Sequence, residues 1–252
     1  MDLSVVVPAY NEERRIGPTL ARIVAYLADR PGSAEVVVVI DGSRDGTAAV
    51  VRQVQSEANR DVPVHLLDHV VNTGKGASVR RGMLAARGDL RLFSDADLST
   101  PIEEVDRLVA AVRAGADVAI GSRRLPDSRI GVRQPWPRRA MGGLFSWCAR
   151  SLVVPGIRDT QCGFKLFTAD ATRRLFPRQR IDEFGFDVEL LWIARRLGLR
   201  VAEVAVTWHD DPRSTVRPVS DAARMLRDLV RIRLADRRGM YAGAVGDNPG
   251  GA

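Results

Sequence analysis

The sequence is poor in the residues that mark several common protein classes. It contains two cysteines and three histidines in 252 residues. Two cysteines are too few for a disulfide scaffold, which favours a reducing cytoplasm, and the scattered histidines predict no metal cluster. No apolar run reaches the roughly 18 residues of a membrane helix. The first residues also lack a leader pattern, so any contact with lipid is expected to be peripheral.

Two widespread nucleotide-binding motifs are also missing. A dinucleotide-binding fold would place Gly-x-Gly-x-x-Gly after the first strand, but residues 8–13 read Pro-Ala-Tyr-Asn-Glu-Glu. Gly74-Lys75-Gly76 does not satisfy the Walker pattern, which requires a longer glycine-bounded loop before the lysine. These absences disfavour a NAD enzyme and a P-loop ATPase. They leave a nucleotide that is held by carboxylates and a metal.

The chain does have an excess of positive charge. Lysine and arginine number 38 against 31 acidic residues, which gives a net charge of +7 that comes from arginine. Such a balance indicates anionic partners: nucleotide phosphates, nucleic acid or a membrane surface. Nucleic acid is the weakest of these, because the chain lacks interleaved aromatic residues and a recognisable binding motif. Salt-sensitive DNA binding would favour it.

Short apolar runs alternate with helix-patterned segments through the first half of the chain. This alternation predicts βαβ units and an α/β fold with a mostly parallel central sheet flanked by helices. We expect a single domain over residues 1–238 and a disordered Gly-rich tail over 239–252. Within the domain we expect a first half built of these units, a second half of different character and a basic C-terminal helix. The boundaries of these three parts are 1–120, 121–218 and 219–238. The strands of the first half are predicted at 4–7, 35–40, 62–67, 90–93 and 116–120.

One predicted strand ends abruptly in two carboxylates, Asp95 and Asp97. Ligands of open α/β sheets bind at this end of the strands. Two carboxylates separated by one small residue offer hard oxygen ligands to a divalent cation that also holds phosphate oxygens. The following residues predict a helix with Thr100 as N-cap, Pro101 at the first helical position and Glu103 closing a capping box.

Polar loops follow four of the predicted parallel strands. All of them should emerge at one edge of the sheet and face one crevice. The sequence therefore predicts that five distant side chains converge there: Glu12, Asp41, Lys75, Asp95 and Asp97. Such a site suits a reaction in which a nucleoside diphosphate leaves and its developing charge must be neutralised.

Five motifs occur in an order that resembles the inverting family 2 glycosyltransferases with a GT-A fold. They are VVPAYNEE (6–13), DGSRDGT (41–47), NTGKG (72–76), DAD (95–97) and GSR (121–123). Two further motifs, GIRDTQCGFKLF (156–167) and FDVELL (186–191), resemble the dolichyl- or polyprenyl-phosphate β-glucosyltransferase branch, which is related to the phosphomannose synthases. The match covers about residues 4 to 236. It implies a single GT-A catalytic domain in which residues 1–120 are the nucleotide-binding half and residues 121–218 are the acceptor half.

The resemblance implies roles for individual residues. It places Asp41 on a uracil base, Asp95 near the ribose and metal, and Asp97 on Mg²⁺ or Mn²⁺. Arg123 and Arg138 would hold the acceptor phosphate. The nucleotide pocket would be lined by Pro8, Ala9, Tyr10, Glu12 and Asp41.

The chain departs from the branch at two places. Ile40 replaces the first of two aspartates that usually precede Gly42; we expect little loss, because the second is the base-reading one. After Trp208 the branch shows Gly-Ser-Lys-Val, but this chain has no lysine there. Arg213 or Arg217 would have to supply that charge.

The resemblance implies an enzyme that moves a hexose, by our choice glucose from UDP-glucose, onto a polyprenyl or dolichyl phosphate with inversion. Asp97, Arg123 and Asp159 are the predicted catalytic residues, with Asp159 orienting the acceptor or acting as base. Asp187 and Glu189 are weaker candidates, and Cys162 is expected to fill space rather than act as a nucleophile. The alternatives are a mannose or N-acetylhexosamine synthase acting on the same lipid, or a family 2 enzyme with a soluble acceptor.

The last predicted helix carries an arginine stripe: Arg224, Arg227, Arg231 and Arg238. The stripe is either a solvated face or a contact with anionic lipid headgroups. Because a polyprenyl acceptor must be reached without a membrane-spanning helix, we favour the membrane. The expected location is cytoplasmic, on the inner face of the cell membrane.

Overall fold

The computed structural model describes residues 1–57, 61–131, 143, 147–210 and 218–241, with the side chains of 218–223 left out. Arg138, Arg213 and Arg217 lie outside these ranges, as do residues 242–252 of the predicted tail. The strands are β1 (Leu3–Ala9), β2 (Ala34–Asp41), β3 (Val64–His69), β4 (Leu90–Ser94), β5 (Val118–Ser122), β6 (Arg129–Ile130), β7 (Phe164–Thr168), β8 (Val201–Ala205) and β9 (Thr207–Trp208). The helices are α1 (Ile16–Asp29), α2 (Thr47–Glu57), α3 (Lys75–Ala85), α4 (Val105–Arg113), α6 (Ala169–Leu175), α7 (Phe186–Arg196) and α8 (Pro218–Arg237), with 3₁₀ turns η1 (Ile102–Glu104) and η2 (Phe176–Arg178).

Seven strands form the main sheet in the order β3-β2-β1-β4-β7-β5-β8. β1 to β4 run parallel to their neighbours in this group, and β5 is parallel to β8, as the sequence predicts. The order of the strands along the sheet reverses between β1 and β4, and ligands of open α/β sheets bind at the carboxyl ends of the strands at such a point. The loop after β1, which contains Tyr10, and the loop after β4, which contains Asp95, leave the sheet at this point.

β7 is the one strand of the main sheet that the sequence pattern did not predict. It runs antiparallel to both β4 and β5 and separates them. Its register pairs Phe93 with Lys165 and Ser94 with Phe164. The GIRDTQCGFKLF motif therefore enters the sheet directly beside the strand that carries the paired aspartates.

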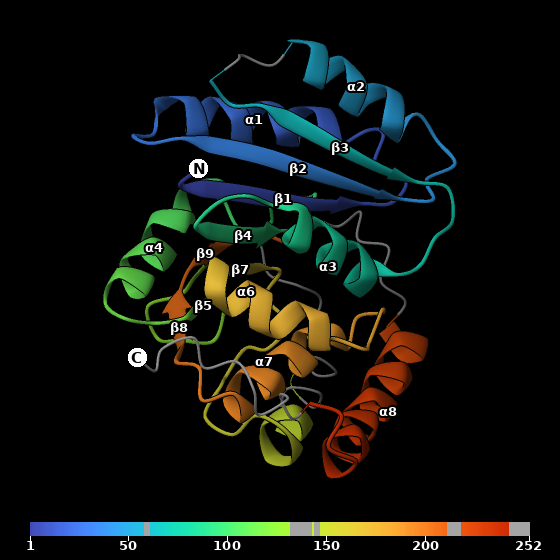
Figure 1. Ribbon diagram of the computed structural model, residues 1–252, viewed down its shortest axis with the longest axis vertical. Helices are drawn as coiled ribbons and strands as arrows, with labels where there is room; N and C mark the ends of the chain where they lie inside the picture. Colours follow the sequence, from blue (N-terminus) through green and yellow to red (C-terminus); the bar gives the residue numbers. More distant parts are fainter. Residues whose placement is uncertain (58–60, 132–142, 144–146, 211–217, 242–252) are drawn as a thin grey trace, which may run out of the picture.

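The sheet is buried on both faces because its central strands are almost entirely apolar. Successive residues of a strand point to opposite faces, and β1 illustrates this: Val5 and Val7 belong to one hydrophobic cluster and Val6 to another. The first cluster is completed by α1 and α4, and the second by α3, α6 and α7. Figure 1 shows α3 and α6 in front of the strands and α8 at the end of the molecule away from α2.

Two local predictions are wrong. Residues 102–104 form the 3₁₀ turn η1 with no side-chain cap, and the Thr100 hydroxyl lies 3.7 Å from the Cys162 sulfur, so no capping box forms. The tail is not disordered from Gly239, because Tyr241 is buried against the core. No described helix has the length and apolar character needed to cross a membrane.

Candidate active site

A charged pair stands at the carboxyl end of β4. The Lys75 ammonium, at the first residue of α3, lies 2.7 Å from the Asp95 carboxylate. The lysine also lies over the rings of Phe93, at 5.4 Å, and Phe184, at 5.9 Å. Burial by itself would lower the pKa of Lys75, but the charges of Asp95, Asp187 and Asp97 together outweigh it and raise that pKa. Lys75 therefore stays protonated and ties the start of α3 to the aspartate loop.

Asp97 is the less satisfied of the two carboxylates. Burial first, and then the neighbouring Asp95 charge, raise its pKa above the ordinary value. One of its oxygens accepts a hydrogen bond from the Ser99 backbone at 2.9 Å, in a turn where Leu98 has a positive φ of 46°. A nearby cation would stabilise the charged form of a carboxylate whose pKa is raised in this way. The hard oxygen of the carboxylate suits Mg²⁺ or Mn²⁺.

The protein supplies only part of a coordination shell here. Among the described residues, no group of three or more histidine, cysteine or acidic side chains could hold a metal ion. Asp95 and Asp97 offer oxygen donors, and the remaining ligands would come from water and substrate phosphates, as is usual for Mg²⁺. The donor set therefore fits a cation that arrives with a diphosphate.

The start of β7 holds the Asp95 loop in place. The Asp95 backbone donates to the Gly163 carbonyl at 3.1 Å. A Cβ atom at Gly163 would lie 1.9 Å from an Asp95 carboxylate oxygen, a separation that no side chain tolerates. Glycine is thus required at position 163 because the carboxylate approaches the backbone of the neighbouring strand.

Asp41 holds the loop that precedes Lys75. It is buried at the end of β2, and one carboxylate oxygen accepts from the Thr73 amide and hydroxyl at 2.9 and 2.8 Å. The other oxygen accepts from the Gly74 amide at 2.8 Å. Gly74 has a φ of 104°, which favours glycine. The predicted contact of Asp41 with a base stays a prediction; its visible task is to shape this loop.

The first loop presents the predicted nucleotide-pocket residues in different ways. Pro8 and Ala9 are the last residues of β1, and Ala9 is buried. Tyr10 follows with nearly half of its surface exposed, at 46%, so its ring is free to meet a planar ligand. Glu12 forms a two-point ion pair with Arg15 at 2.6 Å.

Contacts between loops confirm that these segments converge. The Glu12 amide donates to the Thr47 hydroxyl at 2.8 Å, which joins the loops after β1 and β2. The Thr19 hydroxyl of α1 donates to the Ala96 carbonyl at 2.7 Å, which joins α1 to the aspartate loop. Together with the Asp41 and Lys75 contacts, these bonds link all four loops along one edge of the sheet.

The second half of the chain contributes a buried ion pair. The Arg123 Nε and Nη2 atoms donate to the two oxygens of Asp159 at 2.7 and 2.9 Å, and the Arg123 amide adds a third bond at 2.9 Å. The guanidinium lies 5.3 Å from the Trp208 ring. Burial alone would raise the pKa of Asp159, but the Arg123 charge holds it well below its usual range. The Asp159 charge likewise raises the pKa of Arg123.

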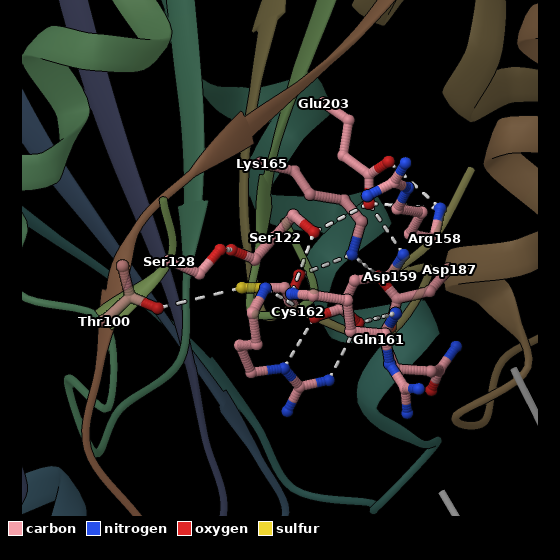
Figure 2. A network of polar contacts seen from close by, with 12 residues as sticks. Thr100, Ser122, Ser128, Arg158, Asp159, Gln161, Cys162, Lys165, Asp187 and Glu203 are labelled. Atoms are coloured by element: carbon pink, nitrogen blue, oxygen red, sulfur yellow. Dashed lines mark hydrogen bonds and ion pairs between the residues drawn. The ribbon is translucent and has the colours of Figure 1, made fainter. Parts of the chain in front are cut away.

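Glu203 supports this pair from β8, a role that sequence reasoning missed. Its carboxylate accepts from the backbone amides of Arg158 and Asp159 at 3.0 and 2.7 Å. It also accepts from the Ser122 hydroxyl, at the end of β5, at 2.7 Å. Figure 2 shows Glu203, Ser122 and Arg158 gathered around Asp159. The loop before β7 is thereby fixed to two neighbouring strands.

A second buried ion pair, also missed, lies beneath the first. Lys165 of β7 is fully buried, donates to the Cys162 carbonyl at 2.6 Å and pairs with Asp187 in the first turn of α7 (Figure 2). The Phe93 ring lies within 6.0 Å of both Lys165 and Lys75. These are the two lysines of the whole sequence. The sequence is rich in arginine but has lysine at only two positions. This contrast is the sequence signal that could have indicated the buried lysine pair.

Two predicted roles do not survive. Asp159 is fully buried with a lowered pKa, so it neither reaches a substrate nor serves as a base; it positions Arg123. Glu189 is buried, and it accepts from the Arg180 and Ile181 amides and the Tyr241 hydroxyl. Its role is structural.

The remaining expectation, for Cys162, agrees with the structure. The thiol is buried, and burial raises its pKa to about 11. A thiol with such a pKa is protonated at neutral pH and is a poor nucleophile.

The site thus combines two half-buried carboxylates, whose oxygens suit a cation, with an arginine held in a buried ion pair. The profile of the family described as "Glycosyl transferase family 2" matches residues 4–179. This chain belongs to that family, and it is a glycosyltransferase with a GT-A fold.

Relatives with established names cover nearly all of the chain. It is 36% identical over 249 residues to the dolichyl-phosphate beta-glucosyltransferase of Dictyostelium discoideum, covering 95% of this chain and 76% of that protein. The human protein of the same name is 37% identical over 244 residues, covering 92% and 75%. The Trichomonas vaginalis protein named dolichyl-phosphate beta-glucosyltransferase ALG5C is 40% identical over 247 residues, covering 94% and 72%.

Solved structures agree on the fold. Glucosyl-3-phosphoglycerate synthase from Mycobacterium tuberculosis, in complex with phosphoglyceric acid, superposes with a TM-score of 0.65 at 21% identity, covering 94% of this chain and 80% of that one. The same enzyme in complex with Mn²⁺ and UDP-glucose gives a TM-score of 0.65, also at 21% identity, covering 94% and 79%. At this identity the likeness concerns the fold alone.

Proposed function

We propose that this protein transfers a glucosyl group from UDP-glucose to the phosphate of a polyprenyl lipid such as dolichyl phosphate. Relatives that carry this activity in their names match more than nine-tenths of the chain. One observation carries the proposal. The Asp95 backbone donates to the Gly163 carbonyl at 3.1 Å, and Asp159, which holds Arg123 through two side-chain bonds, lies four residues before Gly163 in the same segment. An anion-binding arginine and the diphosphate-binding carboxylates therefore belong to one site.

The donor half would bind the nucleotide sugar. Tyr10 is exposed where a uracil ring can stack, and Asp41 lies at the end of the next strand. Asp97, with Asp95, would hold Mg²⁺ or Mn²⁺; Mn²⁺ accompanies UDP-glucose in a solved structure of the same fold. Such a cation, when bound, neutralises negative charge on the diphosphate. Lys75 adds a fixed positive charge beside it and stays protonated because of Asp95.

The transfer needs no strong base. A phosphate monoester carries between one and two negative charges at pH 7, so an oxygen of the acceptor is already nucleophilic. That oxygen forms a bond to the anomeric carbon while the bond from this carbon to the UDP oxygen breaks. UDP leaves with the electron pair, and the configuration inverts from α to β. This agrees with the low pKa of Asp159, which makes that carboxylate a poor proton acceptor.

Arg123 has the task of bringing the second anion close to the first. Two anions a few ångströms apart repel by several kcal/mol at an intermediate dielectric, about 4 kcal/mol at 4 Å. Two of the three guanidinium nitrogens are occupied by Asp159, and we assign Nη1 to the acceptor phosphate. Arg138, Arg213 and Arg217 are proposed as further phosphate contacts.

The test is a panel of nucleotide sugars assayed with dolichyl or undecaprenyl phosphate, with the lipid-linked product followed by mass. The expected product carries one hexose from UDP-glucose and forms only with a divalent cation. UDP-N-acetylglucosamine and GDP-mannose test the alternative sugars. Transfer to water-soluble acceptors such as phosphoglycerate, with none to the lipid, would overturn the assignment of the acceptor.

The variant Arg123→Gln sharpens the test of the acceptor site. It removes the charge but keeps a hydrogen-bonding side chain over Trp208. Because this variant leaves the Asp159 charge buried without its partner, it should also lose stability, so the assays are run below its measured melting transition. In the folded variant we expect KM for the lipid phosphate to rise at least about tenfold, since one charge-assisted contact is lost, with a smaller change in KM for UDP-glucose. An increase confined to the donor KM would place Arg123 in the donor half instead.

A lipid acceptor also implies a location. We propose that the protein works in the cytoplasm, on the inner face of the cell membrane, as a peripheral protein that takes its acceptor from the bilayer.

A further inference from the structure

α8 presents an apolar row to solvent, on the side opposite its buried face. Leu226, Val230 and Leu234 follow one another at a spacing of four residues and are 38%, 54% and 45% exposed. Side chains at this spacing lie on one helix face. Leu229 and Ile232, which are buried, mark the opposite face. The helix is therefore apolar both toward the core and away from it, whereas an ordinary surface helix is apolar on one side.

The charges of α8 are distributed just as unevenly. Its two acidic residues with described side chains face the protein: Asp228 is buried and Asp236 pairs with Arg196 at 2.9 Å. In the described part of α8 and the residue after it, the exposed charged side chains are all arginines. They are Arg224, Arg227, Arg231, Arg233, Arg237 and Arg238. An apolar row flanked by cations, with acids turned inward, has the composition of helices that lie in the plane of a bilayer surface.

The packing of α8 connects this surface to the active site. A Cβ atom at Gly185, the residue before α7, would lie 2.6 Å from the Asp228 carboxylate, so the two helices touch there. Two residues further on, Asp187 forms the buried pair with Lys165. Figure 1 shows α8 as a long helix on the outside of α7. A bilayer against the outer face of α8 would thus lie one helix away from the residues that support the site.

We infer that the outer face of α8, defined by Leu226, Val230, Leu234 and the flanking arginines, docks the protein on an anionic lipid bilayer. The three apolar side chains enter the boundary between headgroups and acyl chains, and the arginines contact lipid phosphates. The choice of a bilayer over a protein partner comes from charge: six exposed arginines repel their copies on a second protomer and attract a surface of uniform negative charge. The exposed side chains of α8 support the docking surface by themselves. The use of this surface in catalysis rests on the proposed lipid acceptor.

The experiment uses the full chain and vesicles of phosphatidylcholine with and without phosphatidylglycerol, in the absence of nucleotide sugar. We expect co-sedimentation with anionic vesicles that falls with added salt and is weak with neutral ones. The triple variant Leu226→Ser, Val230→Ser, Leu234→Ser should lose at least about tenfold in vesicle affinity, since each apolar side chain contributes to the buried area. A single exposed leucine outside α8, Leu84→Ser, is the matched control and should bind as the unmodified chain does.

Charge is tested separately. Arg227→Gln, Arg231→Gln and Arg237→Gln should each weaken binding to anionic vesicles by roughly fivefold, as expected for one cation near such a surface. The control removes the same number of charges from other exposed helices, through Arg52→Gln, Arg113→Gln and Arg173→Gln. If the control weakens binding equally, net charge rather than α8 attracts the vesicles, and the proposal is wrong.

Activity separates this inference from the proposed function. The serine variant should retain turnover with a short-chain polyprenyl phosphate in detergent and lose turnover with the acceptor embedded in vesicles. Loss of turnover in both assays, together with a lowered melting temperature, would mean that the triple variant is misfolded. The vesicle affinity of the single variant Val230→Ser then tests the docking surface. Suppose that the unmodified chain sediments as a dimer, the serine variant as a monomer, and neither binds vesicles. The outer face of α8 would then bind a second copy of the chain, and the proposed bilayer contact would be wrong.

Discussion

The two halves of the site are built by different means. In the half that we propose binds the donor, each loop follows a parallel strand and is held by short bonds to the next loop, such as those of Asp41 with Thr73 and Gly74. In the proposed acceptor half, buried ion pairs hold the loops: Arg123 with Asp159, and Lys165 with Asp187. The first arrangement repeats a local pattern, and the second depends on groups that desolvation would penalise if either partner were missing. The halves should therefore respond differently to mutation.

The largest effect is expected in the donor half, on turnover rather than on stability. Asp97→Ala removes a cation ligand but only one backbone hydrogen bond, from Ser99. We expect kcat to fall by roughly 10³-fold, with an unchanged circular dichroism spectrum and a small shift in melting temperature. Asp29→Ala, at the end of α1, is the control and should be fully active. If Asp97→Ala, or the unmodified protein in EDTA, keeps the full rate, the reaction does not require a metal.

In the acceptor half the same kind of change should unfold the protein. Asp159→Asn leaves the Arg123 charge buried and without its carboxylate, which costs about 3–5 kcal/mol of unfolding free energy. Asp68→Asn is the control: its pair with Arg52 is 2.6 Å long but exposed, so the cost is below about 1 kcal/mol. Urea unfolding followed by fluorescence measures both. Equal costs would mean that burial does not distinguish the two pairs.

The same variant predicts a change in pH dependence. The folded-state pKa of Asp159 lies below its ordinary value of 3.8, so its stabilisation is present above that value and is lost as the pH falls through the folded pKa. The unmodified protein should therefore lose stability in acid more steeply than Asp159→Asn. Urea midpoints compared between pH 6 and pH 3 measure this, and parallel curves would contradict it.

A smaller effect is expected where the halves touch. Gly163→Ala places a methyl group where the Asp95 carboxylate lies, so the aspartate loop must move. We expect kcat/KM to fall by roughly 10- to 100-fold, the cost typical of a misplaced catalytic group. Gly143→Ala, where nothing lies within 4 Å of the added atom, should be neutral. Unchanged activity in Gly163→Ala would show that the exact position of Asp95 is unimportant.

The smallest effect concerns Cys162. Burial raises the pKa of its thiol to about 11, so a maleimide at pH 7.5 should modify the half-buried Cys148 well before Cys162. Cys162→Ala should keep activity within about threefold, because the side chain fills space beside Thr100. Mass spectrometry of labelled peptides gives the order of reaction. Rapid labelling of Cys162, or inactivation by its replacement, would identify a reactive thiol in the site.

The donor half was largely predictable because its information is local. Apolar runs, turn residues and the position of each carboxylate at a strand end suffice to predict parallel strands and converging loops. The acceptor half was less predictable, since β7 pairs with strands that are distant in sequence and antiparallel to it. Asp159 was found by motif but given the wrong role, because a sequence does not show that a carboxylate is buried under an arginine.

The sequence by itself determined the fold class, the family and the gathering of Asp41, Lys75, Asp95 and Asp97 at one edge of the sheet, because side-chain periodicity and strand direction fix where such residues emerge. Only the tertiary structure decided which charges are paired, which are buried and which face solvent. Those properties arise from contacts between elements far apart in the chain. They make Asp159 a support for Arg123, bring both lysines to the Phe93 ring, and leave the outer face of α8 apolar and positively charged.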